Sequence, residues 1–144
     1  MKVDELMTRN PASVTPADTA RDAARAMEKN DCGALPVVES ENEKRLIGMI
    51  TDRDIAIRGV AKGKGPDALV RDLMTDGPDA ARIGDDMKTV KQIMTRNQVR
   101  RVPIIDADNR LVGIIAQADL ARNDDAASDE RVGEVVEKIS KPSR

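Results

Sequence analysis

The sequence predicts an α/β (α+β) fold in which one β-α-β-β-α unit occurs twice, with an approximate two-fold axis relating the copies. The first observation is an internal repeat, because a repeat of this length indicates two copies of one structural unit. The second is the order of patterns in each copy, where a helical apolar period lies between short apolar runs. The matched segments are 3–8 with 70–75, 35–38 with 102–105, and 46–50 with 111–115. Two such copies create a shared cleft, and clefts are where ligands bind.

The first unit is expected to begin with a short helical turn over residues 3–7 and a very short strand at Val14. Thr15 then has the character of a helix N-cap, and Pro16 suits the first helical position, where its missing N–H needs no partner. Apolar residues follow at helical spacing and predict the buried stripe of this helix. These residues are Ala20, Ala23, Ala24 and Met27.

Two strands and a second helix complete the first unit. Residues 34–38 are predicted to be a strand with Pro36 at a sheet edge or strand start, because proline has no N–H to donate. Residues 46–50 are apolar throughout, which predicts a strand covered on both faces. Thr51 is expected to cap the helix that follows. The glycine-rich composition of residues 59–66 is typical of a linker.

The second unit repeats this order, with strands over 101–105 and 111–115 and a last helix over 117–122. The apolar stripe of its first helix consists of Met87, Val90 and Met94. A closing helix is predicted over 128–139. The expected organisation is a first motif over 1–60, a linker over 61–69, a second motif over 70–123, and a C-terminal helix and tail over 124–144, together one module.

The composition excludes several classes of function. The chain has 144 residues, 40% of them hydrophobic, and no Phe, Tyr or Trp, so it lacks the aromatic platforms on which nucleic-acid bases usually stack. The net charge is −2, which argues against a general binder of polyanions such as nucleic acids. The absence of His removes the commonest general base and most zinc sites. The acidic cluster Asp124, Asp125, Asp129 and Glu130 has no calcium-loop spacing, so no metal is expected.

The sequence predicts a soluble, cytoplasmic protein. The N-terminal residues lack the apolar core of a signal peptide, and no apolar run approaches the ~20 residues of a membrane span. Cys32 is the single cysteine, so an oxidising compartment offers no internal disulfide. We interpret Cys32 as a small buried apolar side chain rather than a reactive thiol.

The repeated pattern G-A-L-P-V followed by L-I-G-M-I-T-D-R-D resembles the CBS domain, named for cystathionine beta-synthase. Two such motifs in tandem resemble a CBS pair, or Bateman module, and the similarity covers residues 3–122. The segments 50–55 and 98–103 look especially like small stand-alone CBS pairs of the hypoxic response protein type. The resemblance implies two small sheets, flanked by helices, that face each other pseudo-symmetrically. It also implies adenosyl ligands (AMP, ADP, ATP or S-adenosylmethionine) in the clefts, and dimers.

The resemblance also implies a ligand site. The family signature, a Ser or Thr three residues before an Asp, matches Thr51 and Asp54. The carboxylate would accept hydrogen bonds from the ribose hydroxyls, Met49 would line the adenine slot, and Arg100 and Arg101 would meet the phosphates. A plainer interpretation stays open, in which Thr51 and Asp54 form an ordinary capping box and the arginines pair with surface carboxylates. Arg53 and Arg58 are taken as an exposed helix face.

The equivalent site of the second unit departs from the signature. Asp119 is present, but the residue three positions before it is Ala116 rather than Ser or Thr. Gly33 and Ala34 stand at the positions that match Arg100 and Arg101, so those cations have no counterpart. The helix cap of the second unit is also expected to be lost, since Arg82 stands where the first unit has Thr15. The resemblance therefore implies a weaker second site.

Three functions compete. The first is a regulatory sensor that binds an adenosyl molecule, requires no cofactor, and signals through a conformational change or a regulated protein partner. The second is a ligand-free, dimeric interaction or stress-response protein. The third is an enzyme, which the sequence disfavours because it shows no paired nucleophile and base and no phosphate-binding glycine loop. We expect no catalytic residues and a homodimer, because apolar helix stripes and the closing helix need a partner surface.

Overall fold

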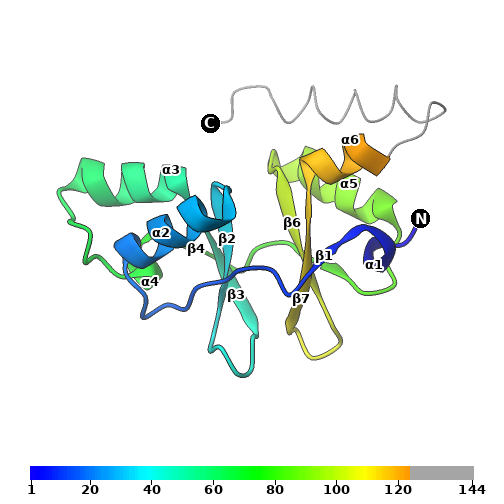
Figure 1. Cartoon of the computed structure of the whole chain (residues 1–144), viewed down its shortest axis with the longest axis horizontal. Helices are drawn as coiled ribbons and strands as arrows, with labels where there is room; N and C mark the ends of the chain where they lie inside the picture. The colour runs from blue at the N-terminus through cyan, green and yellow to red at the C-terminus, as the bar shows by residue number, and fades with distance from the viewer. Residues whose placement is uncertain (124–144) are drawn as a thin grey trace. The chain divides into compact units, whose positions relative to one another are not determined.

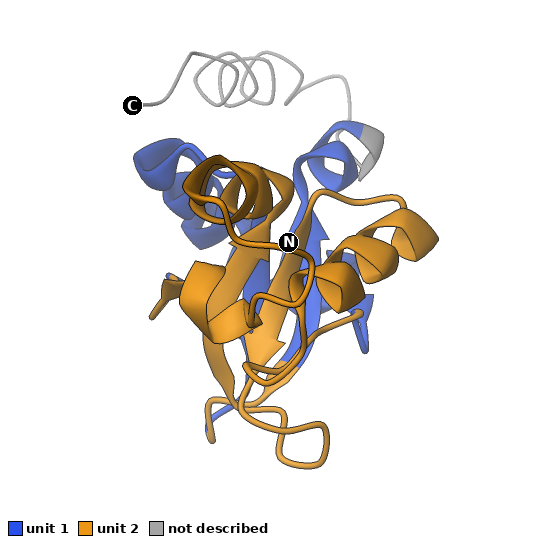
Figure 2. Cartoon of the chain, turned by 90° about the vertical axis from the view of Figure 1, so that its left-hand side faces the viewer, with its two compact units in different colours: residues 1–11, 79–107, 112–144 blue, residues 12–78, 108–111 orange. Residues whose placement is uncertain are grey.

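The computed structural model describes residues 1–123 and divides the chain into two compact units (Figure 2). Unit 1 contains residues 1–11, 79–107 and the described residues from 112 onward, and unit 2 contains residues 12–78 and 108–111. Each unit has one small sheet with helices packed against it (Figure 1). The predicted α/β fold, with two small sheets flanked by helices, is therefore confirmed.

The sheet of unit 2 has the strand order β2-β3-β4. These strands are β2 (Ala34–Val38), β3 (Leu46–Thr51) and β4 (Thr75–Asp76), and both pairings are antiparallel. Helices α2 (Ala20–Asn30) and α4 (Val70–Leu73) supply the apolar residues that pack with β2 and β3 into one core. Strand β2 is the outermost strand of this sheet, which suits Pro36 because it has no N–H to donate. The strand predicted at Val14 is a single parallel bridge to Val37 on the outer side of β2. Cys32 is half-buried against this core.

Helix α2 begins later than the sequence predicted. Its N-cap is Thr19, which forms a capping box with Asp22, and not Thr15. Thr15 instead donates its backbone N–H to Asp18 Oδ2 at 2.8 Å, which closes a turn before the helix. Ala20, Ala23 and Met27 are buried as predicted, but Ala24 is exposed.

Strand β3 is buried on one face only, which corrects the prediction that both faces are covered. Burial alternates along the strand, with Leu46, Gly48 and Ile50 buried and the residues between them half-buried. An apolar run alone does not distinguish a strand covered on both faces from one with a partly open face, because apolar residues occupy both kinds of face. The half-buried face carries Met49 and Thr51.

The helix that follows β3 continues into the predicted linker. It starts as α3 (Asp52–Asp54), widens into the π-helical η1 (Ile55–Gly59), and tightens into the 3₁₀-helical η2 (Val60–Lys62). The first four residues of the segment 59–66 are thus helical. Gly63 ends the helix with a φ of 78°, a left-handed conformation that glycine adopts without a steric penalty.

Unit 1 repeats this plan with the strand order β1-β7-β6-β5. Its strands are β1 (Thr8–Arg9), β5 (Ala81–Arg82), β6 (Arg101–Ile105) and β7 (Leu111–Ala116), and its helices are α1 (Val3–Leu6), α5 (Met87–Asn97) and α6 (Gln117–Asn123). Met87, Val90 and Met94 are buried as predicted, together with Ile93. The cap of α5 is not lost, because Asp86 accepts the backbone N–H of Lys88 at 2.9 Å. The predicted closing helix over 128–139 lies outside the described residues.

The two repeats exchange their first segments. The N-terminal segment of the first repeat lies in unit 1, where Thr8 pairs with Ile114. The matching segment of the second repeat lies in unit 2, where Thr75 pairs with Met49. Each exchanged segment also contributes a methionine that packs on a glycine of the other repeat. Met7 lies against Gly113 in unit 1, and Met74 lies against Gly48 in unit 2. Each sheet therefore contains strands from both repeats.

No helix within residues 1–123 has both the length and the apolar character needed to cross a bilayer.

Candidate ligand-binding site

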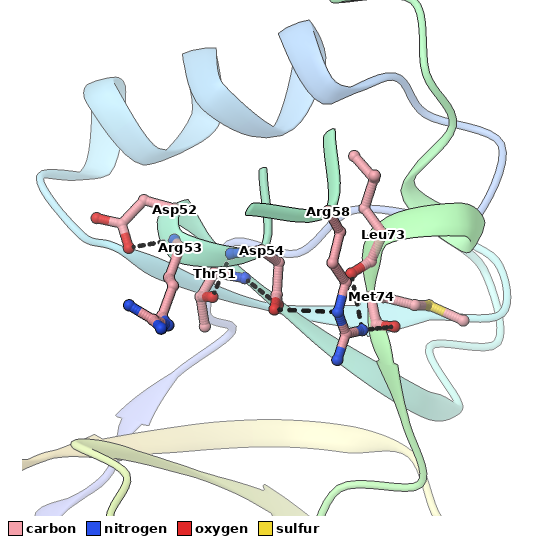
Figure 3. Close-up of polar contacts among 7 residues, drawn as sticks. All are labelled: Thr51, Asp52, Arg53, Asp54, Arg58, Leu73 and Met74. Atoms are coloured by element: carbon pink, nitrogen blue, oxygen red, sulfur yellow. Dashed lines mark hydrogen bonds and ion pairs between the residues drawn. The ribbon is translucent and has the colours of Figure 1, made fainter. Parts of the chain in front are cut away.

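Thr51 and Asp54 form a reciprocal capping box at the end of β3 (Figure 3). The backbone N–H of Asp54 donates to Thr51 Oγ1 at 3.0 Å, and the backbone N–H of Thr51 donates to Asp54 Oδ2 at 2.9 Å. The interpretation of Thr51 and Asp54 as a capping box is therefore confirmed. It does not exclude ligand binding, because an ionised carboxylate has about four acceptor positions and the cap occupies one. The Asp54 side chain is 16% exposed.

Arg58 connects Asp54 to the end of helix α4. Its Nε lies 3.9 Å from Asp54 Oδ1, and one of its terminal nitrogens donates to the carbonyls of Leu73 at 3.2 Å and Met74 at 2.9 Å (Figure 3). The interpretation of Arg58 as only an exposed helix face is wrong, although half of its side chain is accessible. The sequence did hold a signal, since an Asp and an Arg four residues apart on a helix are neighbours.

Met49 lies two residues before Thr51 on the same face of β3. It pairs with Pro36 on β2 and with Thr75 on β4, and it is half-buried. Because side chains alternate along a strand, Met49 and Thr51 point to the same side of the sheet. Unit 2 thus brings together an apolar side chain, a hydroxyl and a carboxylate over the end of one strand.

In unit 1, Asp119 repeats half of this arrangement at the start of α6. Its Oδ2 accepts the backbone N–H of Ala116 at 2.8 Å, and the residue is 7% exposed. The reciprocal bond to a hydroxyl is missing because Ala116 has none. The geometry therefore agrees with the sequence match between Asp54 and Asp119, and with the loss of the hydroxyl in the second unit.

Arg100 and Arg101 lie in unit 1 at the start of β6, where Arg100 is exposed and Arg101 is half-buried. The carbonyl of Arg100 accepts the backbone N–H of Gln117 at 2.7 Å, and in unit 2 the carbonyl of Gly33 accepts that of Asp52 at 2.9 Å. This confirms that Arg100 and Gly33 are equivalent positions. The structure thus groups the predicted site residues by unit, with Met49, Thr51 and Asp54 in unit 2 and Arg100, Arg101 and Asp119 in unit 1.

Among residues 1–123 there is no group of three or more His, Cys, Asp or Glu side chains that could hold a metal ion. The polar groups that unit 2 offers at the end of β3 are a carboxylate and a hydroxyl, with the apolar Met49 on the same face.

The family model of the CBS domain matches residues 3–59 and 70–125. The CBS domain-containing protein YhcV of Bacillus subtilis is 38% identical over 138 residues, which are 96% of this chain and 94% of that protein. Hypoxic response protein 1 of Mycobacterium tuberculosis is 38% identical over 120 residues, or 83% of this chain and 82% of that protein.

Solved structures of CBS proteins are similar to most of this chain. The crystal structure of Hypoxic Response Protein I, which holds two coordinated zinc ions, has a TM-score of 0.79 at 35% identity and covers 87% of this chain and 100% of that chain. CBSX2 in complex with AMP has a TM-score of 0.72 at 26% identity, covering 84% and 94%. The CBS domain pair of protein MJ0100, in complex with 5-methylthioadenosine and S-adenosyl-L-methionine, has a TM-score of 0.74 at 26% identity, covering 85% and 94%.

Proposed function

This chain belongs to the CBS-domain family, and from that premise we propose that it is a regulatory CBS pair that binds an adenosyl ligand. The observation that supports the proposal most is the Thr51–Asp54 pair, whose carboxylate keeps acceptor positions beyond its cap. The complexes of CBSX2 with AMP and of the MJ0100 pair with adenosyl compounds support the ligand class. The name of the mycobacterial relative supports a role in a stress response.

In this proposal each predicted site residue has a role. Asp54 accepts hydrogen bonds from the ribose hydroxyls, and Met49 contacts the adenine. Thr51, Arg100 and Arg101 meet the phosphates, because guanidinium groups match phosphate in geometry and stay charged. Asp119 marks a second, weaker site. The bound ligand favours one conformation of the pair, and a protein partner responds to that change.

A thermal-shift screen over AMP, ADP, ATP, NAD and S-adenosylmethionine tests the proposal. A ligand that binds only the native state stabilises it by about 2.7 kcal/mol at a hundredfold excess over Kd. We expect an adenosyl compound to raise the melting temperature accordingly. If none of the five does so, the adenosyl proposal fails and the ligand-free dimeric protein takes its place.

The phosphates are expected to make binding depend on Arg100 and Arg101. Replacing both by alanine should weaken AMP binding about tenfold or more, because hydrogen bonds to charged groups contribute about 1.5–3 kcal/mol each. Adenosine, which has no phosphate, should bind nearly as before. The affinity for AMP should also fall with added salt, since charge pairs are screened over about 8 Å at physiological ionic strength. Calorimetry measures all three quantities.

The matched control is the double variant Arg25→Ala with Lys29→Ala. Both side chains are exposed on α2, so the net charge changes equally without touching the proposed site. Equal losses for AMP and adenosine in the Arg100 and Arg101 variant would show that the phosphate contacts are assigned wrongly. Two sites of equal affinity would contradict the weaker role of Asp119.

The proposal includes a homodimer, on revised grounds. The stripes of α2 and α5 do not need a partner surface, because their apolar residues other than Ala24 are buried inside their own units. Ile57 and Val60, which are 47% and 70% exposed on the helix after β3, now support the dimer. Light scattering at micromolar concentration should give twice the chain mass. A monomer mass under these conditions rules the dimer out.

A further inference from the structure

Arg58 contacts two segments that come from different repeats. The helix that carries Arg58 and Asp54 belongs to the first repeat, whereas Leu73 and Met74 belong to the segment that the second repeat contributes to unit 2. We infer that Arg58 is a positioning residue that couples ligand binding at Asp54 to this exchanged segment, residues 70–77. The inference rests on the proposed function, since it concerns the regulation of the same site.

The exchanged segment borders the strand that carries the site. Met74 lies against Gly48, Thr75 pairs with Met49, and the backbone N–H of Gly77 donates to the carbonyl of Ile47 at 3.1 Å. Arg58 therefore joins the ribose end of the proposed site, at Asp54, to the strand that flanks the adenine end, at Met49. A change in the position of either end is transmitted through one guanidinium group.

The chemistry of the contacts gives the sign of the coupling, which is reciprocal between the two ends. Leu73 and Met74 stand at the end of α4, where helix carbonyls lack partners within the helix and accept well from arginine. The Asp54 carboxylate lies at 3.9 Å from Arg58, a loose ion pair that a ribose can tighten by fixing the carboxylate in one orientation. A ligand that fixes Asp54 thus holds Arg58 on the two carbonyls and makes residues 70–77 open less often.

The coupling is a property of the first repeat. By the match of Asp54 with Asp119, the residue at the position of Arg58 in the second repeat is Asn123, which carries no charge. The two repeats therefore differ in their response to ligand as well as in the composition of their sites.

Native-state hydrogen exchange at the backbone amides of Met74 and Gly77 tests the inference, with AMP as the probe. Both amides donate within unit 2, Met74 to the carbonyl of Val70 at 2.9 Å and Gly77 to that of Ile47. The variant is Arg58→Gln. The matched control is Arg53→Gln on the same helix, because among the described residues the Arg53 side chain makes no hydrogen bond or ion pair (Figure 3). The calorimetric affinity for AMP is measured in parallel.

Without ligand, we expect both amides to exchange about tenfold faster in Arg58→Gln than in the wild type, while Arg53→Gln matches the wild type. With AMP at saturation, exchange should slow several-fold further in the wild type and in Arg53→Gln, but not in Arg58→Gln. If Arg58→Gln does not fold, Arg58→Lys replaces it, with the same signs and smaller ratios, because lysine keeps the charge but loses the guanidinium fork.

Equal exchange in the two variants without ligand overturns the inference, whether or not AMP binds. It is also overturned if saturating AMP slows exchange in Arg58→Gln as much as in the wild type. Failure of the proposed function looks different: no adenosyl compound binds the wild type, while Arg58→Gln still exchanges faster than Arg53→Gln.

Discussion

Replacing Asp54 by alanine is expected to weaken AMP binding about 10- to 100-fold and to lower the melting temperature as well. The loss of affinity follows from the hydrogen bonds between a carboxylate and the ribose hydroxyls, which contribute about 1.5–3 kcal/mol. The loss of stability follows from the capping box, because Thr51 loses the acceptor for its backbone N–H. Calorimetry with AMP and a thermal melt of the same variant measure the two effects separately.

Unit 2 supplies a matched control in the capping box of Thr19 and Asp22. The backbone N–H of Thr19 donates to Asp22 Oδ2 at 2.9 Å, as Thr51 does to Asp54, and this bond holds the pKa of Asp22 below its ordinary value. Asp22→Ala should therefore lower the melting temperature and leave AMP binding unchanged. If Asp54→Ala behaves in the same way, with unchanged affinity, Asp54 is a capping residue and nothing more.

Replacing Gly48 by alanine is expected to destabilise the protein by about 1–3 kcal/mol, the usual cost of extra volume in a packed region. A Cβ at Gly48 would lie 2.9 Å from the Met74 sulfur and 2.9 Å from the carbonyl oxygen of Thr75. The methionine can rotate away, but the carbonyl belongs to the backbone of β4, so the exchanged segment itself has to move. Urea denaturation of the wild type and the variant measures the difference.

Gly65→Ala is the matched control for this substitution. No atom lies within 4 Å of a Cβ at that position, and its φ is not in the left-handed region. This change should be neutral or stabilise slightly, because alanine restricts the unfolded chain more than glycine does. A loss in Gly48→Ala no larger than in Gly65→Ala would mean that β4 does not constrain β3.

The four longer strands, β2, β3, β6 and β7, were predicted almost to the residue because two independent signals coincide there, whereas the two-residue strands β1, β4 and β5 were not predicted. Apolar runs bounded by polar loops indicate strands, and the repeat shows each run twice, so that 34–38 and 101–105 support one another. Helix starts were harder to predict. Thr15, Thr19 and Thr51 each precede an Asp by three residues, and all three pairs form the same backbone-to-carboxylate bond, but only Thr19 and Thr51 cap helices.

The same degeneracy limits what the sequence says about the site. A Thr and an Asp at this spacing form the same backbone-to-carboxylate bond whether or not a ligand binds, so the pattern becomes specific only through its position after an apolar strand. The segment exchange was not predictable from the repeat, because identical copies do not reveal which copy pairs with which. Without the exchange, the contacts of Arg58 with Leu73 and Met74 could not be inferred, since these residues lie 15 and 16 positions further along the chain, beyond a loop.

The exchange of first segments also has a consequence for a single repeat as a folding unit. A peptide of one repeat alone would form a sheet without its outer strand. The glycine on the neighbouring strand would also lack its contact with the methionine. Two copies of such a peptide can complete each other's sheets by exchanging these segments, as the two repeats do here within one chain. A single repeat on its own is therefore expected to fold only as an intertwined pair of molecules.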